Sequence, residues 1–345
     1  MNFYFLKSSL GCFMALLCLT LSLSAQDRLV LPEVNDYHWT EGWTTVRFFE
    51  SNDAPFVFLG KTSGVSTSGH NAIIHRINID GSIGDRVYEK RWSEGWTSVA
   101  FYEVEGQTYM LRLKERGAGN SGYNVHIDRI NNNGTVGSRV RSYGWSEGWS
   151  TVRTFVVGGK PYLFLLKEQG TGASGKNAHI HPFNSNGTIA QRIYERKWSE
   201  GWTNAEFFQV GGQTYFFQLK QRGFGDSGNN ARIRRVNTDG TLGRTVQAYR
   251  WDEGWSNVRF FEIGGITYSA FLRTRGTDRS GKNCYLHRMT STGRLGAVRG
   301  SFYIESGWTT MEFYDVNQDQ YMFRLRERGY TADDKNVYIH HVQQS

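Results

Sequence analysis

Residues 92–104 read Trp-Ser-Glu-Gly-Trp-Thr-Ser-Val-Ala-Phe-Tyr-Glu-Val, and close variants of this stretch return along the chain at a fixed spacing. The Gly-Trp dipeptide within it recurs every 53 residues, and its tryptophans are Trp43, Trp96, Trp149, Trp202, Trp255 and Trp308. A constant period of this length indicates a repeat architecture. The fold is therefore decided by what one unit forms and by how the units meet.

Each unit contains four runs rich in Val, Ile, Phe and Tyr in alternation with polar residues, which is the pattern of strands. In the second unit these runs are roughly residues 97–104, 108–115, 123–131 and 138–143. Glu105-Gly106 between the first two runs is typical of a tight hairpin turn. Four antiparallel strands in each of six units predict an all-β fold, a six-bladed β-propeller.

The two ends of the chain are complementary. The sixth unit stops at residues 343–345, where its fourth strand should begin, and residues 29–38 align with the fourth strand of the other units. We therefore expect the N-terminal strand to pair into the last blade and close the ring, which removes two exposed sheet edges. The alternative, an open solenoid, would leave these edges free and usually shows atypical end repeats.

The N-terminus has the order of a secretory signal peptide, with Lys7, an apolar run over residues 10–23, and then the small residues Ser24-Ala25. The apolar run is short for a membrane span. We expect residues 1–25 to be a signal peptide and residues 26–345 to be the propeller, which would be secreted, periplasmic or at the cell surface. A retained N-terminal anchor is the alternative.

Charge and cysteine content narrow the possible partners. The formal charge is +8, and removal of Lys7 with the signal peptide leaves +7. This excess favours acidic surfaces such as anionic glycans, but it is too mild and dispersed to argue for nucleic acid. Cys284 is the only cysteine of the mature chain, so stability must come from the core rather than from disulfides.

The long loop after the second strand and the Trp-Ser-Glu-Gly-Trp segment should share one face of the ring, because turns alternate between the two ends of a meander. We expect function on that face. In five units it carries a second Trp, a Glu two residues later and a basic residue that ends the second strand. These candidate ligand-binding residues are Trp39, Glu41, Lys61, Trp92, Glu94, Lys114, Trp145, Glu147, Lys167, Trp198, Glu200, Lys220, Trp251, Glu253 and Arg273.

An aromatic face, a carboxylate and a cation suit a sugar, whose C–H face stacks on the ring while its hydroxyls bridge donors and acceptors. The alternative is structural, with Glu and Lys paired across blades and Trp shielding the pair. In the sixth unit Ile304 and Ser306 replace the Trp and the Glu together, so these residues form one constellation.

The sequence offers no catalytic or metal-binding constellation that stands out. Six near-equal blades argue against a single active site, and we expect no catalytic residues. The third-strand histidines, such as His75 and His181, lie in different blades and do not form one metal cluster. We therefore predict neither a metal nor a cofactor.

One position of the first strand alternates along the chain. It holds Arg in the odd units and Ala or Glu in the even units: Arg47, Arg153 and Arg259 against Ala100, Glu206 and Glu312. We interpret this set as a ring of alternating charges that faces the central channel.

The unit W-S-E-G-W-T-x-V-x-F-F, followed by H-I-H-R-I-N-x-D-G, resembles a tandem repeat common in exported bacterial proteins, over essentially the whole mature chain. In architecture it resembles tectonin-type and fungal fucose-binding propeller lectins, and this resemblance implies sugar sites between blades without assigning any residue. We predict a secreted, multivalent, lectin-like protein without catalytic activity. Its partners would be glycans or glycosylated surfaces, including acidic polysaccharide, with no nucleic acid and no membrane span.

Two other functions remain open at this point. One is a protein-binding or structural propeller of the cell envelope or of a secreted complex. The other is an enzyme that acts on polysaccharide, which would require one place in the ring with a pair of carboxylates and a raised pKa.

Overall fold

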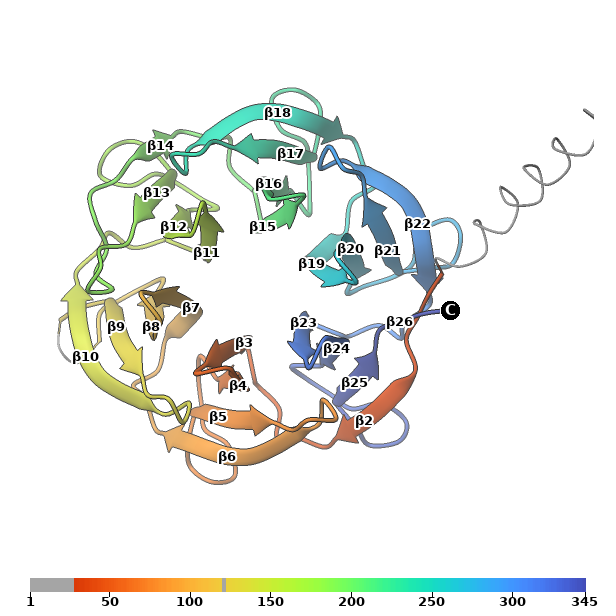
Figure 1. Cartoon of the computed structure of the whole chain (residues 1–345), viewed down its shortest axis with the longest axis horizontal. Coiled ribbons are helices and arrows are strands. Elements are labelled where there is room, and N and C mark those ends of the chain that lie inside the picture. Colours follow the sequence, from red (N-terminus) through yellow and green to blue (C-terminus); the bar gives the residue numbers. More distant parts are fainter. Residues whose placement is uncertain (1–27, 120–121) are drawn as a thin grey trace, which may run out of the picture.

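The computed structural model describes residues 28–119 and 122–345, which form a ring of four-stranded antiparallel sheets around a central channel (Figure 1). All regular elements of this part are strands, and the chain is a six-bladed β-propeller, as the repeat predicts. The signal-peptide prediction falls on residues outside the described part. Within the described residues, no helix has the length and apolar character needed to cross a membrane.

The blades follow one another along the chain. Blade 1 consists of β3 (Thr45–Ser51), β4 (Ala54–Gly60), β5 (Ala72–Ile77) and β6 (Ile83–Lys90). Blade 2 consists of β7 (Trp96–Val104), β8 (Gln107–Lys114), β9 (Val125–Ile130) and β10 (Val136–Tyr143). Blade 3 consists of β11 (Thr151–Val157), β12 (Lys160–Leu166), β13 (Ala178–Pro182) and β14 (Tyr194–Arg196). Blades 4 and 5 consist of β15 (Asn204–Val210), β16 (Gln213–Leu219), β17 (Ala231–Val236) and β18 (Leu242–Tyr249); and β19 (Trp255–Ile263), β20 (Ile266–Arg273), β21 (Cys284–Met289) and β22 (Leu295–Phe302).

Blade 6 is built from both ends of the chain. Its strands β23 (Thr310–Val316), β24 (Asp319–Leu325) and β25 (Val337–His341) come from the C-terminal region, and β2 (Glu33–Tyr37) supplies the outer strand. Asp36 lies opposite Tyr338 and Tyr37 opposite Val337 in the antiparallel register. A further pair, β1 (Leu29–Val30) with β26 (Gln343–Gln344), adds to the junction. The predicted closure of the ring is confirmed.

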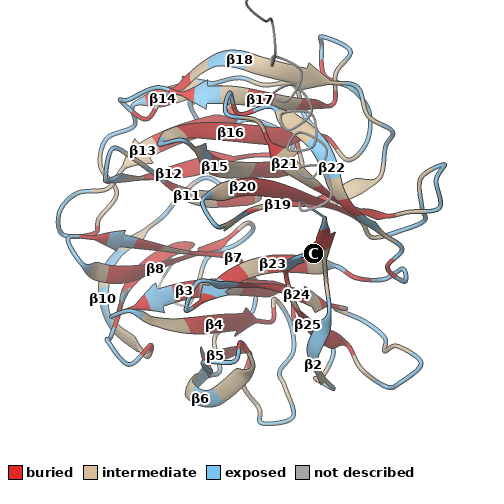
Figure 2. Ribbon diagram, turned by 45° about the vertical axis from the view of Figure 1, so that its right-hand side comes forward, coloured by how far each residue is buried: buried red, intermediate tan, exposed pale blue. Residues whose placement is uncertain are grey.

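The core lies between the blades rather than inside any one of them. The second strands are apolar along their length, as in β4, because each blade is covered on both faces by its neighbours. Figure 2 shows the buried residues concentrated on the inner strands and the exposed residues in the loops. Aromatic pairs join neighbouring inner strands, for example Phe49 with Phe101 at 3.9 Å between ring centroids and Phe208 with Phe260 at 4.0 Å. Stacking of this kind supplies much of the contact energy of such interfaces.

The short turns also lock blades together. Gly81, in the turn between β5 and β6, has φ +78°, and a Cβ atom there would come within 2.3 Å of the Tyr321 ring of the preceding blade. The Tyr314 hydroxyl donates a hydrogen bond to the Gly81 carbonyl at 2.5 Å. Only glycine fits this contact, which explains why the turn repeats Asn-x-x-Gly so regularly.

Candidate functional site

The predicted ligand-binding residues lie at the blade junctions, where their polar atoms bind the protein itself. The Glu side chain accepts a hydrogen bond from a loop glycine of the preceding blade, as Glu94 Oε1 does from the Gly64 amide at 2.9 Å. The same bond recurs between Glu147 and Gly117, Glu200 and Gly170, Glu253 and Gly223, and Glu41 and Gly329. These carboxylates therefore hold the long loops in place.

The lysines are turned inward. The ammonium groups of Lys61, Lys114, Lys167 and Lys220 each donate to the backbone carbonyl of the Glu in the same unit. Lys61 Nζ also lies 4.9 Å from the ring centroid of Trp43, and the lysine is only 6% exposed. Burial lowers the pKa of Lys61, and the nearby Glu41 charge opposes that shift. Arg273 takes the same place over Trp255, at 4.6 Å.

An asparagine completes each junction. Asn71 is buried, and its side-chain amide donates to the Trp92 carbonyl at 3.0 Å and accepts from the Trp92 amide at 2.6 Å. Equivalent contacts join Asn124 to Trp145, Asn177 to Trp198, Asn230 to Trp251, Asn283 to Ile304 and Asn336 to Trp39. We call the set of these contacts at one blade junction a junction clamp; at the junction of blades 1 and 2 it consists of Asn71, Trp92, Glu94 and Lys114. The structural alternative thus accounts for these polar groups without a ligand.

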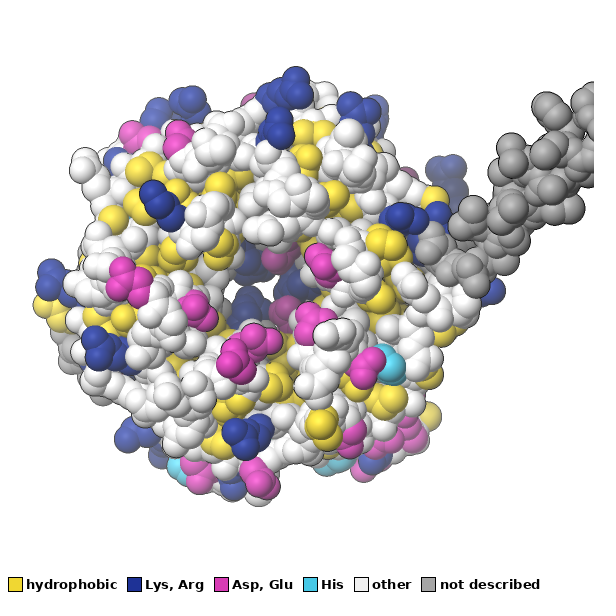
Figure 3. All heavy atoms as spheres, viewed as in Figure 1, with side chains coloured by type: hydrophobic (Ala, Val, Ile, Leu, Met, Phe, Trp, Pro, Cys, Tyr) yellow, Lys and Arg dark blue, Asp and Glu magenta, His cyan; other side chains and the backbone are white. Residues whose placement is uncertain are grey.

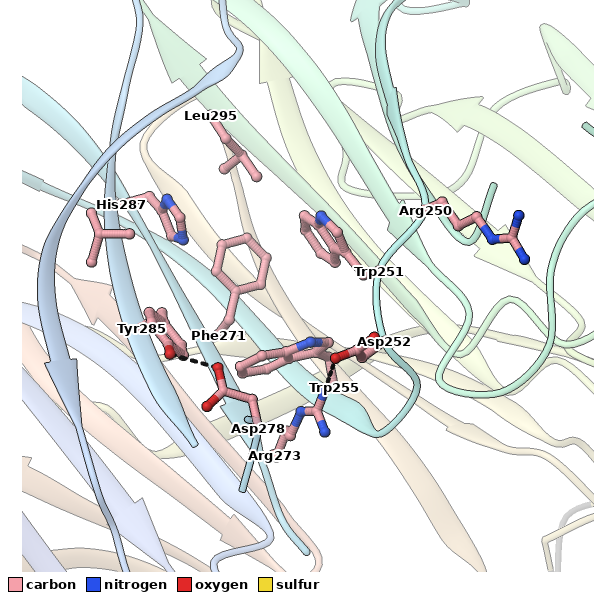
Figure 4. Close-up of a pocket in the computed structure, with 11 residues that line it drawn as sticks. Arg250, Trp251, Asp252, Trp255, Phe271, Arg273, Asp278, Tyr285, His287 and Leu295 are labelled. Atoms are coloured by element: carbon pink, nitrogen blue, oxygen red, sulfur yellow. Dashed lines mark hydrogen bonds and ion pairs between the residues drawn. The ribbon is translucent and has the colours of Figure 1, made fainter. Parts of the chain in front are cut away.

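The clamp of blade 5 opens into a pocket of about 450 Å³ (Figure 4). Its walls include the rings of Trp251, Trp255 and Tyr285. Asp278 accepts a hydrogen bond from the Tyr285 hydroxyl at 2.5 Å. The pKa of Asp278 is about 2, because hydrogen bonds from Tyr285 and Ser280 outweigh the effect of burial. The pocket can therefore seat a sugar-sized group, but its fixed carboxylate is a poor proton donor.

The predicted charge ring is present in the central channel. Arg259 pairs with Glu312 at 2.7 Å and with Glu206 at 2.8 Å. Arg47 pairs with Glu312 at 2.7 Å, and Arg153 pairs with Glu206 at 2.8 Å. The interpretation drawn from the alternating sequence position is confirmed.

A cluster of carboxylates lies beyond this ring, at the end of the inner strands next to the short hairpin turns. Glu50, Glu262 and Asp315 occupy the same position on β3, β19 and β23, three residues after the ring position. Figure 3 shows acidic side chains around the mouth of the channel and basic side chains deeper inside it. We call Glu50, Glu262 and Asp315 the mouth cluster.

One carboxyl group of the mouth cluster has a raised pKa. The Asp315 side chain is exposed at the surface, and loss of hydration beside its neighbours, followed by the like charges of Glu50 and Glu262, raises its pKa to about 6. A carboxyl group between two carboxylates stays protonated well above its usual range. This shift distinguishes one side of the channel mouth from the rest of the ring.

Sequence reasoning missed this cluster, although a signal was present. At the 53-residue period the position is acidic in units 1, 2, 5 and 6, which are contiguous around the closed ring, whereas units 3 and 4 carry Val156 and Gln209. We followed the Trp-Ser-Glu-Gly-Trp segment, which recurs in nearly every unit, and did not compare the units at this less regular position. The site also lies on the face opposite the long loops, where we did not expect function.

No model of a known protein family matches the chain, and no curated protein matches it. Among similar solved structures, a subtype N10 neuraminidase-like protein from a little yellow-shouldered bat isolate has a TM-score of 0.52 at 11% identity, covering 92% of this chain and 99% of that chain. A protein of Bacteroides fragilis described as exported has a TM-score of 0.50 at 10% identity, covering 92% and 95%. A GH43_1 enzyme from Xanthomonas citri, complexed with xylose, has a TM-score of 0.45 at 10% identity, covering 71% and 87%.

These likenesses concern the fold, and they bear on two predictions. We expected a lectin-like protein that is not an enzyme, with a protein-binding or structural propeller and a polysaccharide-acting enzyme as the alternatives. Several of the similar structures are family-43 glycoside hydrolases, with TM-scores of 0.40–0.47 at 10–14% identity, and another is the neuraminidase-like protein. The prediction that the protein is not an enzyme rested on the equality of the blades, and the mouth cluster shows that the blades are not equal. Both the lectin-like function and the prediction that the protein is not an enzyme are therefore withdrawn.

Proposed function

We propose that the protein hydrolyses glycosidic bonds of a carbohydrate substrate at the mouth of the central channel, with Asp315 as the general acid. The observation that carries the proposal is the raised pKa of Asp315 between two carboxylates from neighbouring blades. Glycoside hydrolysis requires such a pair, in which one carboxyl group is protonated and the other is ionised. An enzyme that acts on polysaccharide requires one place in the ring with a pair of carboxylates and a raised pKa, and the mouth cluster supports such an assignment.

The roles follow from the two protonation states. Neutral Asp315 would give its proton to the leaving oxygen as the glycosidic bond breaks. Glu50, on the adjacent inner strand β3, would be the second carboxyl group of the pair and would stabilise the positive charge that develops on the sugar ring. Glu262 on the other side keeps the pKa of Asp315 raised. Each residue therefore has a separate task in one reaction.

Location and substrate are consistent with this chemistry. The N-terminal pattern supports export, as does the resemblance of the repeat to exported bacterial proteins, and an exported hydrolase would meet extracellular glycans. The aromatic pocket of blade 5 is lined by residues of the long loop and the Trp segment, so it lies apart from the mouth cluster and would offer a separate place for a sugar ring (Figure 4). Its two Trp rings suit the C–H faces of sugars.

The experiment is a hydrolysis screen with purified protein on plant and bacterial polysaccharides and on aryl glycosides, with released reducing ends as the readout. The wild type should cleave at least one substrate, and Asp315→Asn should lower the rate by about 10²–10⁴-fold. Asp319→Asn is the matched control, since Asp319 lies in the same hairpin and pairs only with His341 in the described structure. The proposal fails if no substrate is cleaved or if Asp315→Asn cleaves as fast as the wild type.

A further inference from the structure

The charge ring in the channel has one vacant position. Ala100 stands in blade 2 where Glu206 and Glu312 stand in blades 4 and 6. Arg259 has a carboxylate on each side. Because blade 2 lacks a carboxylate at this position, Arg47 and Arg153 each pair with only one. The two arginines with a single carboxylate partner are those that flank Ala100 around the ring.

The vacancy leaves a positive charge without compensation. The ring contains three guanidinium groups and two carboxylates, and Glu312 is only 9% exposed. The two flanking carboxylates outweigh burial and raise the pKa of Arg259. The pKa of Arg47 is instead lowered to about 10, because burial, together with the charges of Arg153 and Arg259, outweighs the favourable charges of Glu312 and Glu206. A partly buried excess of one positive charge is unfavourable, so the space beside Ala100 favours an anion.

The protein itself shows how an anion would be held. Glu312 bridges two arginines, since its Oε1 accepts from Arg47 at 2.7 Å and its two oxygens accept from Arg259 at 2.7 and 2.8 Å. A cavity of about 160 Å³ lies beside Ala100, and both Arg47 and Arg153 line it. At roughly 30 Å³ for each water molecule, this space holds a group of a few non-hydrogen atoms.

We infer that a carboxylate anion binds in the channel beside Ala100, between Arg47 and Arg153, in the place of the missing glutamate. A planar carboxylate offers two oxygens in the arrangement that guanidinium groups bind best. Two sources can supply this carboxylate: a small free acid, or an acidic sugar that enters the channel. This inference is independent of the hydrolytic function, because it concerns different residues and needs no bond to be broken.

The test measures binding by calorimetry and thermal unfolding in a sulfonate buffer at pH 7 and constant ionic strength. Sodium acetate and sodium galacturonate are compared with sodium chloride. We expect one saturable site for at least one of the two carboxylates and a rise in Tm beyond that given by chloride. Binding of acetate would identify a site for free acids, and binding of galacturonate alone would identify a site for acidic sugars.

Substitutions at Ala100 separate charge from shape. Ala100→Glu should raise the Tm without ligand and weaken carboxylate binding by about tenfold or more, because the built-in side chain takes the site. Ala100→Gln has nearly the same shape and should also weaken binding, but it should not raise the Tm. The inference is overturned if neither carboxylate binds the wild type more tightly than chloride does, or if Ala100→Glu binds as the wild type does.

Discussion

Replacement of Asn230 by alanine tests whether the junction clamps hold the ring together. Asn230 is fully buried, and its side chain donates to the Trp251 carbonyl at 3.0 Å and accepts from the Trp251 amide at 2.7 Å. Each lost hydrogen bond costs about 1 kcal/mol, and a backbone group left without a partner adds roughly 1 kcal/mol more when it is partly buried. We therefore expect Asn230→Ala to lower the free energy of unfolding by about 2–4 kcal/mol.

The assay is equilibrium unfolding in urea, followed by tryptophan fluorescence. With a slope of about 3 kcal/mol per molar, the midpoint should fall by roughly 1 M. Asn237→Ala is the control in the same blade, because Asn237 is exposed and its side chain donates to the Thr241 hydroxyl of its own turn at 2.9 Å. If Asn230→Ala shifts the midpoint no more than Asn237→Ala does, the clamps do not stabilise the ring and the predicted ligand role returns to consideration.

Two further predictions concern closure and acid stability. A chain without residues 1–38 lacks β1 and β2, so it exposes the edge of β25 and should aggregate or melt well below the full chain; a monomer with the wild-type Tm would contradict the pairing. Burial and the Arg324 charge lower the pKa of His340 from 6.5 to about 3. In the unfolded chain His340 binds a proton below about pH 6.5, whereas in the folded protein it does so only near pH 3. The free energy of unfolding should therefore fall as pH drops from 6.5 toward 3, and His340→Gln should make it less dependent on pH in this range. Urea titrations at several pH values would show it, and equal slopes for both proteins would refute it.

The architecture could be predicted from the sequence because it depends on local and periodic features. The 53-residue spacing of the Gly-Trp dipeptide predicted six blades. The pairing of residues 33–37 with the last blade could be predicted because the last unit ends before its fourth strand. The charge ring was accessible for the same reason, since Arg47, Arg153 and Arg259 recur at a fixed register.

The use made of polar groups could not be predicted in the same way. Glu94 and Lys114 look like ligand-binding residues in the sequence, and only the packing of one blade on the next shows that they bind Gly64 and the backbone. The raised pKa of Asp315 depends on charges that lie far away in the sequence and close together in space. The repeated motif identifies residues that recur in every unit, whereas a catalytic site requires residues that occur together in only one part of the ring.

The most direct test of the account is the pH dependence of kcat/KM on a substrate found in the hydrolysis screen, measured for the wild type and for Glu262→Gln. Wild-type activity should fall as pH rises through about 6, because Asp315 loses the proton that it must donate. Glu262→Gln removes one of the like charges that raise this pKa, so the midpoint should move to lower pH. A midpoint that is the same in both proteins would contradict the assignment of Asp315 as the general acid.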